Sequence, residues 1–474
     1  MKNFGWEVSE ARGHVRRGRR DQAASGPGCA QALWTTDGGN RVNTSVTFKF
    51  SFEKNGVVAL GVALLATCAL AAQSAPPLPS PFATPWYRKG TRVVGMPEGH
   101  RLTVPPGFTV TLFADTLQMA RFMALAPNGD VLLSEPVRSA GTITVLRDAD
   151  RDGVAETRET LATGLNRPFG LAFWKDYLYV GNNDSVVRLK YTPGQTSSAD
   201  SRPEKIVDLP GSDAAIDEDT ARRLNIPLSQ TRGYNHWTRN VIFNAAGTKL
   251  YVTVGSATNA TPENAGVAVE RAAIHAYNPD GTGHRLFASG LRNPVGLAWY
   301  PASTTLWTAV NERDHLGDDL VPDFITSVRD GGFYGWPYSY IGTHVDPTVS
   351  TPRPDLVSRA IVPDVLLPSH AAALGLLFYT GTQFPAEYRN SAFVALHGSI
   401  NRSRLSGYKV VRVPFRNGRP SGPPENFLTG FIARDDDQKE AWGRPVGLLQ
   451  LPDGSLLVSD DGGNRIWRVS YGAR

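Results

Sequence analysis

Residues 290–337 read GLRNPVGLAWYPASTTLWTAVNERDHLGDDLVPDFITSVRDGGFYGWP, and this stretch decides the fold. It opens with a polar pair, Arg292 and Asn293, and continues through two apolar runs that are separated by a turn at 301–304. The second run ends in a polar loop, 311–319, which is dense in carboxylates and glycine. Short apolar runs bounded by turn residues are typical of buried strands. We therefore predict a pair of strands that ends in a functional loop.

The same strand-pair pattern recurs along the chain, which is typical of repeat architectures. One copy contains Asn128-Gly129, a dipeptide that favours tight hairpin turns. The copies span residues 123–134, 167–180, 241–254, 294–310, 372–396 and 444–459. Segments such as 143–146 and 466–469 follow the copies and can supply outer strands. Six such units predict an all-β fold, a six-bladed β-propeller. The alternative fold is two β-sandwiches in tandem.

The net charge of +5 is confined mainly to the N-terminus. Residues 1–54 hold nine basic and five acidic side chains, which leaves a net charge of only +1 for the rest of the chain. A domain that is nearly neutral lacks the basic surface that nucleic acids require. We therefore expect no nucleic-acid partner.

The N-terminal 72 residues have the features of a leader with a signal peptide. An apolar run at 56–72 follows Lys54, and Ala69 and Ala71 fit a cleavage site with small residues. The run is short for a membrane span, so we expect export to the periplasm or the medium and no stable membrane span. The alternatives are an uncleaved anchor and a lipoprotein linked through Cys68. Both cysteines, Cys29 and Cys68, lie in this leader, so the mature chain is expected to lack disulfides.

The remainder divides into a Pro-rich linker at 73–101 and a propeller domain at 102–474. Within that domain, His236 precedes one inner strand and is a candidate general base, because the ordinary pKa of histidine is near neutral pH. Arg292-Asn293 and Arg444 occupy the equivalent position in two other blades. A propeller would direct these groups at one axial point, which suits a ligand with several carboxylates. The alternatives are a structural loop histidine and arginines that only cap strand edges.

Several segments together resemble the soluble glucose/sorbosone dehydrogenases that use pyrroloquinoline quinone (PQQ). The resemblance covers about residues 102–471 and rests on their order along the chain. The segments are HWTRN, GLRNPVGLAW, ERDHLGDDLVPD, GGFYGWP, HGSINRS with GYKVVRVPF, and GRPVGLLQLPDGSLLVSDDGGNRIWRV. The resemblance implies a six-bladed propeller that binds PQQ and Ca²⁺. It also implies oxidation of a sugar by hydride transfer to PQQ, followed by electron transfer to an external quinone or cytochrome.

The resemblance also assigns roles to individual residues. His236 matches the catalytic base, and Arg313 and Asp314 match positions whose backbone carbonyls bind Ca²⁺, a cation that prefers oxygen ligands. The residues that match or lie near cofactor-binding positions are Arg121, Arg292, Asn293, His397, Arg402 and Arg444. Two positions depart from the glucose enzymes: Ser256 replaces an aspartate that supports the histidine, and Val295 replaces a polar cofactor contact. These departures favour a sorbosone-like substrate over glucose.

A second metal motif lies at 148–159 and does not depend on that resemblance. Asp148, Asp150, Asp152 and Glu159 match the spacing of a calcium-binding loop, in which alternating oxygen ligands wrap one ion. The residues before the motif have the pattern of a strand, so the flanking helices of an EF-hand are absent from the pattern. The segment is either a structural Ca²⁺ site or a solvated acidic turn.

Two other functions fit a six-bladed propeller, because fold alone does not fix function. One is a Ca²⁺-dependent hydrolase of the lactonase type, which would need carboxylates or asparagines at several blade starts. The other is a non-catalytic propeller that binds a sugar or a protein. The arginines at the blade starts favour the dehydrogenase over the hydrolase, and His236 together with Arg292-Asn293 favours it over the binding protein.

Overall fold

A computed structural model describes residues 75–87, 90–137, 140–197, 202–211, 236–260 and 270–472. These residues belong to one compact unit, 71–474. The predicted leader, 1–72, lies outside the described residues, as does most of the segment before His236. Among the residues that the structure describes, no helix is long and apolar enough to cross a membrane.

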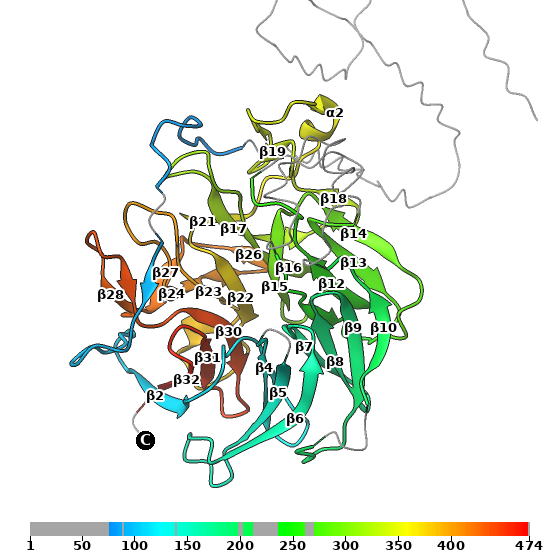
Figure 1. Cartoon of the computed structure of the whole chain (residues 1–474), viewed down its shortest axis with the longest axis vertical. Coiled ribbons are helices and arrows are strands. Elements are labelled where there is room, and N and C mark those ends of the chain that lie inside the picture. The colour runs from blue at the N-terminus through cyan, green and yellow to red at the C-terminus, as the bar shows by residue number, and fades with distance from the viewer. Residues whose placement is uncertain are drawn as a thin grey trace, which may run out of the picture. The chain divides into compact units, whose positions relative to one another are not determined.

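The structure is built from sheets in the order that the repeats predicted (Figure 1). The first three blades contain β3 (Met123–Leu125), β4 (Val131–Glu135), β5 (Gly141–Arg147) and β6 (Thr157–Leu165); β7 (Leu171–Trp174), β8 (Tyr177–Asn182), β9 (Ser185–Lys190) and β10 (Glu204–Asp208); and β11 (Val241–Phe243), β12 (Leu250–Val254), β13 (Ala273–Tyr277) and β14 (Arg285–Ser289). The next three contain β15 (Asn293–Trp299), β16 (Leu306–Asn311), β17 (Pro322–Val328) and β21 (Val365–Ser369); β22 (Ala373–Phe378), β23 (Ala392–Leu396), β24 (Lys409–Val413) and β27 (Glu425–Leu428); and β30 (Pro445–Gln450), β31 (Leu456–Asp460), β32 (Arg465–Tyr471) and β2 (Phe108–Ala114).

Short elements fill the connections between the blades. They are β1 (Arg92–Val93), β18 (Gly332–Phe333), β19 (Ser339–Tyr340), β20 (His344–Val345), β25 (Phe415–Arg416), β26 (Arg419–Pro420), β28 (Ile432–Arg434), β29 (Glu440–Ala441), the helix α2 (Pro354–Val357) and the 3-10 helix η2 (Ala386–Tyr388). Of these, β18 extends the third blade through β14, and β1 pairs with β29.

The first strands of successive blades contact one another in the order β3, β7, β11, β15, β22 and β30, and β30 contacts β3 again. The ring is therefore closed. The sixth blade joins both ends of the domain, because β2 pairs antiparallel with β32 and places Phe108 opposite Tyr471. Closure of the ring leaves only short, protected sheet edges. The predicted six-bladed β-propeller is confirmed.

Burial follows from this stacking of sheets. Every residue of the second strands β4, β12, β23 and β31 is buried. A second strand lies inside its own sheet, and neighbouring blades cover both faces of that sheet. Such a strand has no face in water, so its sequence is a continuous apolar run and not an alternating one. This is why the repeats stand out in the sequence as short apolar runs.

The topology also places the predicted site residues on one face of the ring. Adjacent strands of a blade are antiparallel, so the start of the first strand and the end of the second lie at the same face. His236, Arg292 and Arg444 precede first strands, while Arg313 and His397 follow second strands. We call this the site face. The 148–156 loop joins β5 to β6 and therefore lies on the opposite face.

Candidate active site

His236 stands at the entrance to the third blade with its backbone in a left-handed conformation, at φ +53°. The buried guanidinium of Arg239 donates to the His236 carbonyl at 2.6 Å and to the Thr238 carbonyl at 2.8 Å. The ring is held separately, since Nδ1 lies 2.8 Å from the Ser256 carbonyl and 3.0 Å from the Ser256 hydroxyl. Both the backbone and the ring of His236 are therefore fixed.

These contacts determine which ring nitrogen carries the proton. A carbonyl oxygen can only accept, so Nδ1 of His236 must donate to Ser256. The Ser256 hydroxyl donates to the Thr258 carbonyl at 2.7 Å, so toward His236 it can only accept. Nε2 is left with its lone pair. Burial, and next the charge of Arg292, lower the pKa of His236 well below its ordinary value. The ring is thus a neutral base at neutral pH.

Arg292 and Asn293 lie buried next to His236. Arg292 donates to the Asn259 carbonyl at 3.1 Å, to the Asn259 side-chain oxygen at 2.5 Å and to the Asn311 carbonyl at 3.2 Å. These neutral oxygens orient the guanidinium but do not neutralise its charge. The Asn293 side-chain oxygen is buried and has no hydrogen-bond partner in the structure. A Cβ on Gly255 would lie 2.3 Å from that oxygen and 2.4 Å from Cβ of His236, so Gly255 allows the two groups to approach.

A second group of charged residues comes from the first, fifth and sixth blades. Asp461 forms an ion pair with Arg121 at 2.8 Å, and its other carboxylate oxygen lies 2.8 Å from Nε2 of His397. Arg444 donates to the His397 and Gly398 carbonyls at 3.2 and 2.7 Å. Burial, and next the charge of Arg444, lower the pKa of His397 to about 4, so this histidine is neutral. Burial opposes ionisation of Asp461, but Arg121 and His397 bring the pKa of Asp461 below its ordinary value. The group therefore carries a net positive charge.

The floor between these two groups is apolar and receives side chains from every blade. Phe169, Val295, Leu374 and Val446 form a buried cluster, against which Phe122 and Trp237 pack. The guanidinium of Arg121 lies 5.2 Å from the centre of the Trp237 ring. The floor excludes water beneath the charged groups, and water exclusion strengthens their interaction with a ligand. Val295, the position where the glucose enzymes are polar, belongs to this floor.

Arg313 and Asp314 lie in the 311–319 loop, where the resemblance implies carbonyl ligands for Ca²⁺. The Arg313 side chain is buried, forms an ion pair with Asp346 and donates to the Asp314 carbonyl at 3.0 Å. The Asp314 carboxylate contacts Nδ1 of His370 at 2.7 Å and accepts from Asn259 at 2.8 Å. Burial disfavours the charged form of Asp314, but His370 and Arg292 lower its pKa below the ordinary value. The loop is thus rigid and carries an ionised carboxylate.

Arg402 does not join either charged group described above. It donates to the Asp318 carbonyl at 2.5 Å and to the Asp319 carboxylate at 3.0 Å. These contacts link the loop of the fifth blade to the 311–319 loop of the fourth. The resemblance places both His397 and Arg402 near the cofactor. The structure places His397 beside Asp461 and Arg444, whereas Arg402 joins two loops.

Three contributors to the site face were missed by sequence reasoning. Asp461 bridges Arg121 and His397, Asn259 bridges Arg292 and Asp314, and Trp237 packs under Arg121. Trp237 had a signal, because it follows His236 directly. Asp461 also had a signal in the sequence. It follows the second strand of its blade, as the predicted site residues Arg313 and His397 do.

The residues of the site face fit the groups that the resemblance implies. Arg121, Arg292 and Arg444 approach from three blades, two of them oriented by neutral oxygens, and together with the unpartnered oxygen of Asn293 they fit a planar cofactor with several carboxylates. The Asp314 carboxylate and the carbonyls of its loop are oxygen donors, which fit Ca²⁺. The Asp314 carbonyl already accepts from Arg313, so one of its lone pairs is used.

The acidic loop on the opposite face gathers four carboxylates. Ligand oxygens of Asp148, Asp150, Asp152 and Glu156 all lie within 4.8 Å of one another. Glu156 takes the place for which the motif predicted Glu159, because Glu159 lies in β6 opposite Val145. Three backbone amides, those of Asp152, Gly153 and Val154, donate to the aspartates of the loop.

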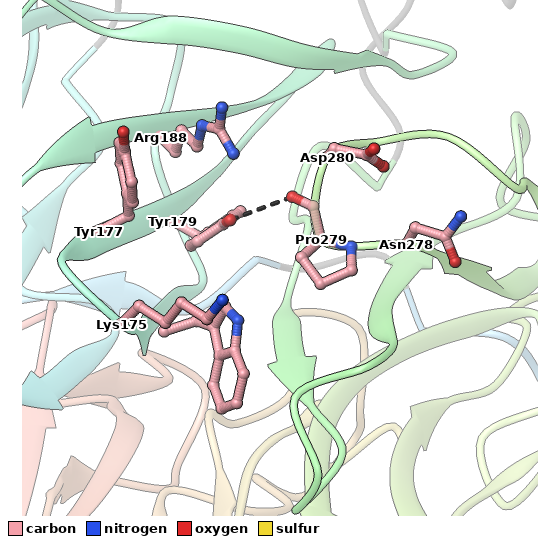
Figure 2. Close-up of a pocket in the computed structure, with 8 residues that line it drawn as sticks. Lys175, Tyr177, Tyr179, Arg188, Asn278, Pro279 and Asp280 are labelled. Carbon is pink, nitrogen blue, oxygen red and sulfur yellow. Dashed lines mark hydrogen bonds between the residues drawn. The ribbon is translucent and has the colours of Figure 1, made fainter.

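A separate groove also opens at the opposite face, beside the turn between β7 and β8 and the segment after β13. Figure 2 shows its lining, in which the Tyr179 hydroxyl donates to the Pro279 carbonyl at 3.0 Å. The residues that line it are Trp174, Lys175, Tyr177, Tyr179, Arg188, Asn278, Pro279 and Asp280. None of them belongs to the site face.

Solved structures with the same fold include several enzymes. The structure matches a Trichoderma reesei enzyme of carbohydrate-active enzymes family AA12 with a TM-score of 0.64, 19% identity, and coverage of 80% of this chain and 100% of that chain. The PQQ domain of pyranose dehydrogenase from Coprinopsis cinerea gives a TM-score of 0.61, 21% identity, and coverage of 79% and 98%. The PQQ-bound aldose sugar dehydrogenase of Streptomyces coelicolor gives a TM-score of 0.52 and 17% identity. The match covers 78% of this chain and 99% of that chain.

Relatives in sequence include the following two proteins. An uncharacterized protein of Borreliella burgdorferi is 28% identical over 377 residues, which cover 78% of this chain and 91% of the relative. The PQQ-dependent pyranose dehydrogenase of Coprinopsis cinerea is 34% identical over 127 residues, which cover 24% of this chain and only 17% of the relative.

The closed ring places the chain in the class of six-bladed β-propellers, the fold that it shares with these solved structures. Within that class, it belongs to the TrAA12-like family, whose model matches residues 102–322 and 354–472. The resemblance seen in the sequence is confirmed.

Proposed function

We propose that this protein is an exported, PQQ- and Ca²⁺-dependent oxidoreductase that oxidises a sorbosone- or aldose-like sugar. The observation that carries the proposal is the geometry of His236. Its Nδ1 donates to Ser256, so Nε2 carries the lone pair, and Arg121, Arg292 and Arg444 lie on the same face of the ring as this histidine. Membership of the TrAA12-like family supports the proposal.

The residues of the site face have separate tasks in this proposal. Arg121, Arg292, Asn293 and Arg444 hold the carboxylates of PQQ, and the 313–314 segment supplies oxygen ligands for Ca²⁺. PQQ, when bound, would supply the acceptor for the hydride, with its two electrons, that leaves the sugar carbon. His236 takes the proton of the sugar hydroxyl at Nε2, which leaves that carbon as a carbonyl. A general base of this kind accelerates a reaction by about 10²–10⁴-fold.

The finer features of the proposal come from single positions. Ser256 and Val295 stand where the glucose enzymes place polar or charged groups, which supports a sorbosone-like sugar. The apolar run at 56–72 supports export to the periplasm or the medium. The final acceptor of the electrons would be an external quinone or cytochrome.

The test uses purified protein to which PQQ and CaCl₂ are added. We expect a shifted absorbance spectrum on binding, and a panel of aldoses, aldosones and polyols should contain a sugar that bleaches the oxidised quinone band. His236→Ala should bind PQQ as the wild type does but bleach about 10²–10⁴-fold more slowly. His100→Ala, a histidine in the segment before β2, is the control and should behave like the wild type.

Two results would contradict the proposed function, and a third would contradict the role of His236. Bound PQQ that no sugar in the panel reduces would favour a non-catalytic, sugar-binding propeller. Hydrolysis of a lactone that needs Ca²⁺ but no PQQ would favour the hydrolase alternative. A His236→Ala variant with more than about a tenth of wild-type turnover would remove His236 from the mechanism.

A further inference from the structure

The segment predicted as a Pro-rich linker packs against the site face. We call residues 75–87 and 90–94 the strap. The Pro76 carbonyl contacts Nε2 of His344 at 2.9 Å, next to the fourth blade. Thr91 donates to the Ser399 carbonyl at 2.9 Å in the fifth blade. β1 pairs in parallel with β29, which precedes the sixth. The strap therefore contacts connections of three successive blades.

Its central part holds the 315–319 loop, which continues from the proposed Ca²⁺-binding segment. The Thr84 hydroxyl accepts from the backbone amides of Asp318 and Asp319 at 2.9 and 3.3 Å. The Phe82 amide donates to the Leu316 carbonyl at 2.6 Å. A Cβ on Gly317, which has φ +133°, would lie 2.9 Å from the Thr84 carbonyl. The loop and the strap are thus in direct backbone contact.

The same loop is held from its other side by the fifth blade. Arg402 donates to the Asp318 carbonyl, and the Ser403 amide donates to the Asp318 carboxylate at 2.8 Å. Trp86 adds a ring contact, since its centroid lies 4.0 Å from that of His315. His315 and Asp314 are adjacent in the chain, so any shift of the loop moves the proposed ligand carbonyls.

We propose that the strap is part of the functional face and that Thr84 and Trp86 are positioning residues for the 313–319 loop. By fixing that loop, they set the affinity for Ca²⁺ and PQQ. The family match begins at residue 102, so this device lies outside the part of the chain that the family model matches. The proposal rests on the function proposed above, because it concerns the same site.

The test compares the wild type with Thr84→Val, which keeps the shape of the side chain but removes the acceptor. Amide hydrogen exchange of residues 316–320 is measured in the full protein without cofactor. We expect it to be about tenfold faster in the variant, because the amides of Asp318 and Asp319 lose their acceptor. We expect the Kd of PQQ, measured with Ca²⁺ by absorbance titration, to rise about tenfold as well. Thr84→Ser restores the hydroxyl and should restore both quantities. Trp86→Ala should shift both in the same direction.

The matched control is Thr305→Val, because Thr305 is an exposed turn residue on the opposite face whose hydroxyl also accepts a hydrogen bond. Unchanged exchange in Thr84→Val would overturn the proposal, and so would faster exchange with an unchanged Kd of PQQ. A wild type that binds no PQQ overturns the proposed function, and with it the effect on affinity. Failure of the proposed function can be told apart from failure of the strap proposal, because in the latter case the wild type still binds PQQ.

Discussion

Ser256 orients His236 without placing a negative charge beside it. An aspartate at this position would stabilise the imidazolium form, whereas the Ser256 carbonyl and hydroxyl fix the tautomer and leave the ring neutral. Burial and Arg292 then disfavour protonation further. The serine is therefore a sufficient support for the ring, and its main chemical consequence is a less basic His236.

The pH dependence of turnover follows from this arrangement. Because the pKa of His236 lies well below 6.5, the base stays unprotonated as pH falls from 8 to 6, and we expect nearly constant turnover in that range. In Ser256→Asp, the carboxylate raises the pKa of His236, so turnover should already decline between pH 7 and pH 6. The measurement is the pH profile of kcat at saturating sugar and PQQ. Superimposable profiles for the two proteins would contradict this account of the base.

Arg292 should contribute to cofactor affinity and not only to the packing of its strand. Loss of one partner from a buried charged hydrogen bond typically costs about 2–5 kcal/mol, so Arg292→Ala should raise the Kd of PQQ by about 30-fold or more. The control is Arg285→Ala, since Arg285 is a largely exposed arginine of the same region that pairs with Asp330. An unchanged Kd in Arg292→Ala would leave this arginine with a strand-capping role alone.

At the scale of the element, β13 carries a buried histidine, His275, which contacts the exposed His284 and which the mechanism does not use. Nε2 of His275 must donate to the Glu270 carbonyl at 2.8 Å, since a carbonyl only accepts. Nδ1 of His275 must then accept from Nε2 of His284, which lies at 2.9 Å. Protonation of His275 would make its Nδ1 a donor as well, so the contact with His284 would last only if His284 changed its tautomer. Burial is the main reason that the pKa of His275 falls to about 4.

This pair predicts a loss of stability in acid. Between pH 6.5 and 4 the unfolded chain binds a proton at His275 that the folded chain does not. The free energy of unfolding is therefore highest above pH 6.5, and it falls as the pH is lowered from 6.5 to 4. The size of this fall is roughly 3 kcal/mol. His275→Gln keeps a donor for the Glu270 carbonyl but cannot be protonated. Urea unfolding at pH 7.5 and 4.5 should show a smaller loss in the variant, and equal losses would contradict the prediction.

Individual elements were predictable where the pattern is local. The apolar runs of second strands and the polar loop after β16 follow from burial and turn chemistry, which neighbouring residues determine. The carboxylates of the acidic loop were predicted in part: Asp148, Asp150 and Asp152 converge, but Glu156 joins them in place of Glu159. The motif assumes a helix after the loop, whereas this loop continues into β6.

At the scale of the whole molecule, the sequence pattern predicted the ring and the positions of its cations but not their partners. The six repeats imply a closed propeller, and closure brings Arg121 from the first blade to Asp461 in the sixth. Which side chains meet across blades depends on how far each one reaches, and no local pattern encodes this. The strap was missed for a similar reason, because its contacts lie more than two hundred residues away in sequence.

Glycines set how closely the blades approach. A Cβ on Gly296 would lie 2.5 Å from the Leu374 carbonyl of the next blade, and one on Gly375 would lie 2.3 Å from the Val446 carbonyl. Gly447 stands in the same relation to the Arg121 carbonyl, at 2.5 Å. The fifth repeat lacks the proline of its neighbours but keeps this glycine, because contact between first strands leaves no room for a side chain.

Gly447 lies where the last blade meets the first, so it tests both closure of the ring and its link to the site. In Gly447→Ala the new methyl group must displace the backbone of Arg121, and overpacking of this kind costs about 1–3 kcal/mol. We expect a lower midpoint in urea unfolding and, because Arg121 moves, a higher Kd of PQQ. Gly95→Ala is the control, since a Cβ there has no atom within 4 Å. Gly447→Ala could instead match that control in both measurements. The contact between β30 and the residues before β3 would then be looser than in the structure, and the position of Arg121 would not depend on closure of the ring.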